Sequence, residues 1–96
     1  MPEIIIDVGR QMDGATFRLS PQASARLAAR KLGNPLASSL FVTFTTQEAF
    51  ERKHGSMWTQ IAMLLTGLTA DQIEEEGGFR FVNPADRETL FESRAA

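Results

Sequence analysis

The sequence contains no cysteine and no tyrosine, and it has one histidine and one tryptophan among 96 residues. Without cysteine the chain can form no disulfide, no cysteine-ligated zinc site and no thiol nucleophile, which fits a reducing compartment. No stretch approaches the roughly 20 apolar residues of a membrane span, and the first ten residues lack the pattern of a signal peptide. We therefore expect a cytoplasmic protein that does not enter a membrane.

The rest of the composition is typical of a globular protein. Hydrophobic residues make up 43% and charged residues 23% of the chain, both ordinary values, and the length predicts a single domain over residues 1–96. The charge is uneven, because residues 1–46 carry five bases and three acids whereas residues 47–96 carry five bases and nine acids. This polarity is milder than the basic bias of most nucleic-acid-binding domains.

Four segments have the pattern of β-strands. They are rich in β-branched and aromatic residues, or they alternate between apolar and polar residues. Asp13-Gly14 is a hairpin turn signal between the first two strands. The strands are expected over residues 3–10, 15–20, 39–45 and 79–83.

The helical segments begin at recognisable caps. Ser20-Pro21 combines a capping hydroxyl with a proline suited to the first helical position, and Thr45 with Glu48 forms a possible capping box. Asn83-Pro84 gives a similar start near the C-terminus. Helices are expected over residues 21–32, 46–55, 57–68 and 84–94, with a short capped turn over 69–76.

These elements follow one another in the order β-β-α-β-α-α-β-α. The order predicts an α+β fold in which helices pack on one face of a four-stranded, mostly antiparallel sheet. The segment from Met57 to Leu68 is the most apolar of the helices, so we expect it to cover most of that face.

Catalytic patterns are weak in this chain. Glu51 and His54 have a spacing seen in carboxylate-bridged metal sites, but a lone histidine cannot complete such a site in one chain. No serine lies in a G-x-S-x-G elbow, and the run Glu74 to Glu76 is expected to form a solvated turn. We therefore predict no catalytic residue, no metal and no cofactor, although a small enzyme with an open cavity near His54 stays a third alternative.

The leading functional hypothesis is a small, non-enzymatic bacterial or phage module that binds a protein. The apolar helix and its neighbours hold more apolar side chains than one helix face can hide, and methionine and tryptophan are common at adaptable contact surfaces. A protein partner, self-association as a homodimer, or both are expected. The predicted anchors are Phe50, Met57 and Trp58, and the charged rim is Glu51, Arg52 and Lys53.

The alternative hypothesis is a DNA-binding transcriptional regulator. The stretch "TFRLSPQASARLAARKLG", residues 16–33, resembles the strand and first helix of a ribbon-helix-helix domain. This resemblance implies that Thr16, Arg18 and Ser20 read bases in the major groove. Arg26 and Arg30 form a basic stripe along the following helix, which is also typical of an ordinary solvated helix face.

A second resemblance covers about 45 residues further along the chain. "LFVTFTTQEAFERKHG", then "IAMLLTGL" and "GGFRFVNP", are similar in layout to SseB-type (enhanced serine sensitivity) domains. The matching residues are Phe44-Thr45, Glu48, Leu64-Leu65 and Asn83-Pro84. The resemblance implies a small bacterial α+β module that binds a partner and does not turn over a substrate.

Overall fold

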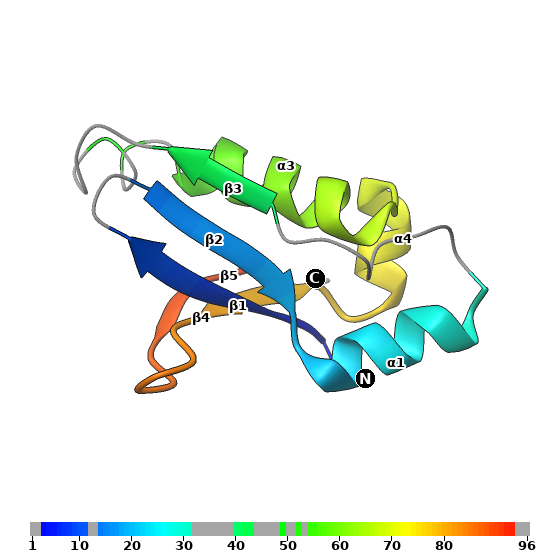
Figure 1. The fold of residues 1–96 in the computed structure, drawn as a ribbon. Coiled ribbons are helices and arrows are strands. Elements are labelled where there is room, and N and C mark those ends of the chain that lie inside the picture. Colours follow the sequence, from blue (N-terminus) through cyan, green and yellow to red (C-terminus); the bar gives the residue numbers. More distant parts are fainter. Residues whose placement is uncertain are drawn as a thin grey trace.

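A single mixed sheet forms one layer of the molecule, and helices pack against one of its faces (Figure 1). The computed structural model describes residues 3–11, 14–31, 40–43, 49, 52 and 54–93. The sheet has five strands in the order β3-β2-β1-β4-β5. The strands are β1 (Ile4–Gln11), β2 (Gly14–Leu19), β3 (Leu40–Thr43), β4 (Phe79–Val82) and β5 (Thr89–Ser93), and the helices are α1 (Pro21–Ala29), α3 (His54–Thr66) and α4 (Ala70–Glu75).

The central strand β1 pairs in opposite senses with its two neighbours. It is antiparallel to β2, with Val8 opposite Phe17, and parallel to β4, with Ile6 opposite Phe81. These four side chains share one face of the sheet and are at most 1% exposed. Ile4 and Ile6 therefore lie in the middle of the sheet, where both neighbouring strands and the helical layer bury them, whereas Ile5 is half-buried on the opposite face.

The aromatic core links the helical layer to the sheet. The ring of Trp58 on α3 meets that of Phe17 edge-on at 5.7 Å between centroids, lies 4.3 Å from Phe81, and stacks on Phe91 at 6.0 Å. Such aromatic contacts stabilise a core beyond the burial of their area. The expectation that α3 covers the sheet is confirmed, and the covered face also receives Leu27 of α1.

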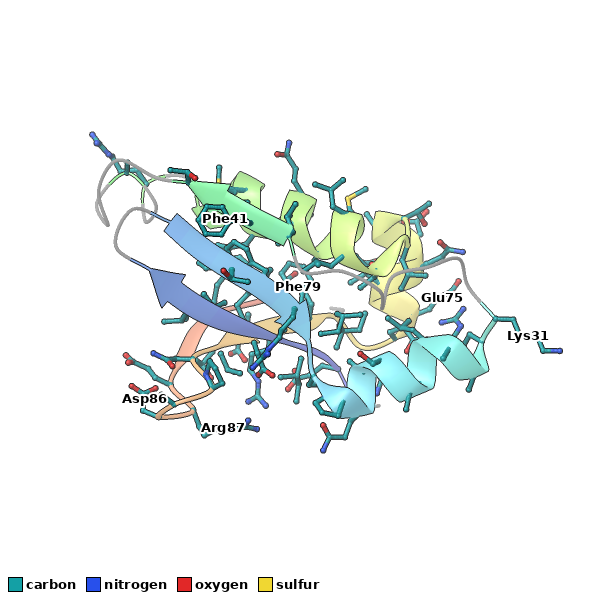
Figure 2. The ribbon with its side chains drawn as sticks, in the orientation of Figure 1. Lys31, Phe41, Glu75, Phe79, Asp86 and Arg87 are labelled. Atoms are coloured by element: carbon teal, nitrogen blue, oxygen red, sulfur yellow. The ribbon has the colours of Figure 1, made fainter. Side chains whose placement is uncertain are left out.

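The opposite face of the sheet is not covered by any helix of the described residues. Alternation along the strands places Thr16, Arg18, Phe41 and Arg80 there. Phe41, labelled in Figure 2, is 52% exposed, and its ring lies against Gly14 of the neighbouring strand. An aromatic ring laid over a strand glycine compensates for the missing side chain.

The helix ends follow the caps present in the sequence. The Ser20 hydroxyl accepts a hydrogen bond from the Ala23 amide at the start of α1, and Thr69 forms a full capping box with Gln72 at the start of α4. At the end of α4 the amides of Gly77 and Gly78 donate to the carbonyls of Glu74 and Ile73. Both glycines have positive φ angles, 99° and 90°, so this is a Schellman motif that turns the chain into β4.

The α+β class is confirmed, with helices on one face of a sheet, but some details of the elements differ from the prediction. The segment expected as a helix over residues 84–94 is a turn followed by β5, which pairs with β4 and makes the sheet five-stranded where four strands were expected. The sheet is mixed because β1 and β4 are parallel, although the other three pairings are antiparallel. Helix α1 also ends before its expected boundary, because Lys31 leaves the helix with a φ angle of 59°. Most of the expected helix over 46–55 lies outside the described residues, although Ala49 and Arg52 have helical backbone.

Candidate functional site

The outer side of α3, which faces away from the sheet, carries an exposed apolar side chain, Leu64. Its inner side chains, among them Ile61 and Leu65, are at most 4% exposed, whereas Leu64 is 70% exposed. Beside Leu64 lies a groove of about 490 Å³. It is lined by Gln60, Met63, Leu64, Gly67, Leu68 and Thr69. We call this surface the α3 groove.

The end of α3 leaves no free backbone amide in the α3 groove. Gly67, with a φ angle of 73°, ends the helix, and its amide donates to the Met63 carbonyl at 2.9 Å. The Leu68 amide donates to the Thr66 hydroxyl at 3.2 Å, and the Thr69 amide to the Gln72 side chain at 2.9 Å. Because these donors are already used, the α3 groove offers apolar contact and few polar contacts.

The chain that follows the α3 groove is acidic. The chain contains no lysine or arginine between Lys53 and Arg80. Helix α4, which follows the α3 groove directly, exposes Asp71, Glu74 and Glu75. Figure 2 labels Glu75, the last residue of α4.

The fourth acid of this segment, Glu76, is buried, and two arginines of α1 bind it. Arg26 Nε donates to Glu76 Oε1 at 2.8 Å, and Arg30 Nη1 donates to Oε2 of the same carboxylate. The Glu76 side chain is 8% exposed, and those of Arg26 and Arg30 are 26% and 33% exposed. The expectation of a fully solvated acidic turn is therefore wrong at Glu76, and the basic stripe of α1 binds this chain's own carboxylate.

The predicted partner-binding residues differ in their exposure. Trp58 is 2% exposed and belongs to the core, so it is not a surface anchor. Met57 is half-buried and packs against the core, and Arg52 is exposed. The side chains of Phe50, Glu51, Lys53 and His54 lie outside what the structure describes.

Sequence reasoning did not single out Leu64 as a binding residue. It lies within an almost continuous apolar run, and periodicity alone does not show which members of such a run face outward. Trp58 and Leu65 lie one above the other on the face of α3 that packs on the sheet. Leu64 lies outside that face, and this spacing is the signal in the sequence that its side chain points outward.

Only some of the predicted DNA-binding residues lie on an open surface of the molecule. Thr16 and the exposed Arg18 lie on the uncovered face of the sheet. Ser20 is 5% exposed and its hydroxyl caps α1, so this side chain does not project toward a ligand. Arg26 and Arg30 are bound to Glu76, as described above.

A smaller crevice of about 180 Å³ lies between α4, α3 and the sheet. Thr59, Asp71, Glu74 and Ser93 are among the residues that line it. Among the residues that the structure describes, no three His, Cys, Asp or Glu side chains lie where they could hold one metal ion. None of the described helices is long and apolar enough to cross a membrane.

Comparison of the chain with protein-family models, with curated proteins and with solved structures found no match. The resemblances to SseB-type and ribbon-helix-helix domains therefore stay predictions.

Proposed function

We propose that this chain is a small, non-enzymatic module that binds a protein through the α3 groove. The observation that carries the proposal is the 70% exposure of Leu64, a large apolar side chain beside a groove lined mostly by apolar residues. Large exposed apolar surfaces on small proteins often mark interaction sites. The bacterial and cytoplasmic setting expected from the sequence is part of this proposal.

The proposal moves the predicted anchor from Trp58 to Leu64. A substitution of the buried Trp58 would disrupt the core and therefore would not report on binding. Leu64 can be replaced at little cost to the fold, because most of its surface is already in water. Leu64→Ser is therefore a suitable probe of the function.

The test is site-specific photo-crosslinking in cells of the source organism. A photoreactive residue replaces Gln60 at the edge of the α3 groove, and a control chain carries it at Gln22, which is exposed on α1. We expect a discrete adduct from position 60 that Leu64→Ser abolishes, and no such adduct from position 22. An adduct of twice the chain mass would identify the partner as a second copy. An adduct that Leu64→Ser leaves unchanged would contradict the proposal.

A further inference from the structure

We infer that the edge strand β3 pairs antiparallel with β3 of a second copy of this chain, which joins two five-stranded sheets into one. The inference goes beyond the function proposed above, because no residue of β3 is among those that line the α3 groove. It follows from the difference between the two edges of the sheet.

The two edge strands, β3 and β5, are protected to different degrees. An edge strand presents unpaired N–H and C=O groups, and charged residues or bulges on it disfavour pairing with another chain. Strand β5 has both features, since Glu92 is exposed and a register shift interrupts its pairing with β4 beside Val82. Strand β3, with the sequence LFVT, contains no charged residue and no proline, and its pairing with β2 is regular. Of the two edges, that of β3 is therefore the one open to a further strand.

The side chains of β3 leave its outer side accessible. Phe41 is 52% exposed, yet its ring lies against Gly14 of β2, toward its own sheet. Thr43 is exposed on the same face as Phe41, whereas Leu40 and Val42 pack against the core. Figure 1 shows β3 as the last strand on its side of the sheet. A strand that docks there meets backbone groups and the side chains of Phe41 and Thr43.

A second copy of β3 fits this edge. Antiparallel residues directly opposite each other share a face, so Phe41 would lie beside Phe41 or Thr43 of the second copy. Aromatic pairs and pairs of an aromatic with a β-branched residue stabilise adjacent strands, and an uncharged strand that pairs with itself brings no like charges together. A two-fold axis through the pair satisfies both open edges at once. Only the protected β5 edges then remain outside, so assembly stops at a dimer.

Sedimentation equilibrium of the full chain tests the inference with two matched variants. Thr43→Lys adds a charge to the β3 edge, and Thr89→Lys adds the same charge to the β5 edge at a threonine that is also exposed. We expect a dimer whose population rises with concentration, since a strand of four residues offers few hydrogen bonds. Thr43→Lys should raise the dissociation constant of the dimer about tenfold, whereas Thr89→Lys should leave it unchanged.

Nuclear magnetic resonance of the unaltered chain locates the contact. In a mixture of isotope-labelled and unlabelled chains, nuclear Overhauser effects between copies should arise from residues 40–43. The amides of β3 should also exchange with solvent more slowly at concentrations that favour the dimer. These measurements do not depend on the folding of a variant, and circular dichroism checks that both lysine variants are folded.

Each result supports or overturns the inference. A chain that stays monomeric at about 1 mM would overturn it. So would a dimer that Thr43→Lys and Thr89→Lys weaken equally, or contacts between copies that do not involve β3. A dimer that Leu64→Ser dissociates and Thr43→Lys does not would place self-association at the α3 groove. That outcome would overturn the inference and leave the proposed function standing.

Discussion

The carboxylate of Glu76 joins α1 to the end of α4, and its removal should destabilise the whole domain. Glu76→Gln keeps the shape of the side chain but removes the charge that binds Arg26 and Arg30. Removing one member of a fully buried ion pair typically costs about 3–5 kcal/mol. The two arginines are 26% and 33% exposed and can partly turn toward water, so we expect a loss of about 2–3 kcal/mol.

A loss of this size is a large part of the roughly 5–15 kcal/mol that stabilises a domain. It should lower Tm by about 10–15 °C in a chain of this length. Fluorescence of Trp58, the sole tryptophan, provides the signal for urea and thermal unfolding. The control is Glu75→Gln on the exposed side of the same helix, which should change stability by less than about 0.5 kcal/mol. Equal stabilities of the two variants would refute the role assigned to Glu76.

Four further checks follow, the first three by urea unfolding monitored by circular dichroism, since one of the variants lacks Trp58. Trp58→Ala should cost about 3–5 kcal/mol, and a loss below about 1 kcal/mol would contradict its place in the core. Lys31→Gly should stabilise the chain by about 0.5–1 kcal/mol, because its φ angle of 59° strains a residue with a side chain; a loss of stability would contradict this. Gly14→Ala should cost about 1–2 kcal/mol, since the new methyl group would lie 2.7 Å from the ring of Phe41, and Phe41→Ala in the same chain should recover part of the loss. The DNA-binding alternative predicts salt-sensitive retention on duplex DNA that Arg18→Ala abolishes, and retention that persists in this variant would exclude the predicted mode.

Local signals in the sequence were enough to find most of the elements. The caps at Ser20 and Thr69 define the starts of α1 and α4 as expected, because capping depends only on residues within one helical turn. The strands β1 to β4 were found from their alternation and β-branched content. The hairpin of β1 and β2 was expected from Asp13-Gly14 and is present, but the place of β4 beside β1 was not found, since the parallel pairing of Ile4 with Phe79 joins residues far apart in the chain.

The error at the C-terminus has a local cause. Asn83-Pro84 was interpreted as a helix start, and the Asn83 side chain does accept a backbone hydrogen bond, from Ala85 at 2.9 Å. The same chemistry occurs in turns, and here the turn leads into β5. Pairing with β4, with Phe91 opposite Phe81, decides between strand and helix, and the pattern of residues 84–94 does not by itself reveal this pairing.

The type of candidate site, an apolar surface, was predicted from the sequence, but the residues that form it were not. An excess of apolar side chains was expected at Met57 and Trp58, whereas the residue that stays exposed after the sheet face is covered is Leu64. Trp58 was predicted to be a surface anchor because tryptophan is common at contact surfaces, yet its ring packs in the core against Phe17 and Phe81. The pairing of Glu76 with Arg26 and Arg30 depends on tertiary contact between α1 and α4, which no local pattern encodes.

The parallel pairing of β1 with β4 determines when this chain can complete its fold during synthesis. The hairpin of β1 and β2 is made first, but the other neighbour of β1 begins at Phe79. An isolated two-stranded hairpin is at best marginally stable in water. The isoleucines of β1 therefore stay partly unprotected until β4 has left the ribosome, and during that interval the nascent chain is exposed to aggregation and to chaperones.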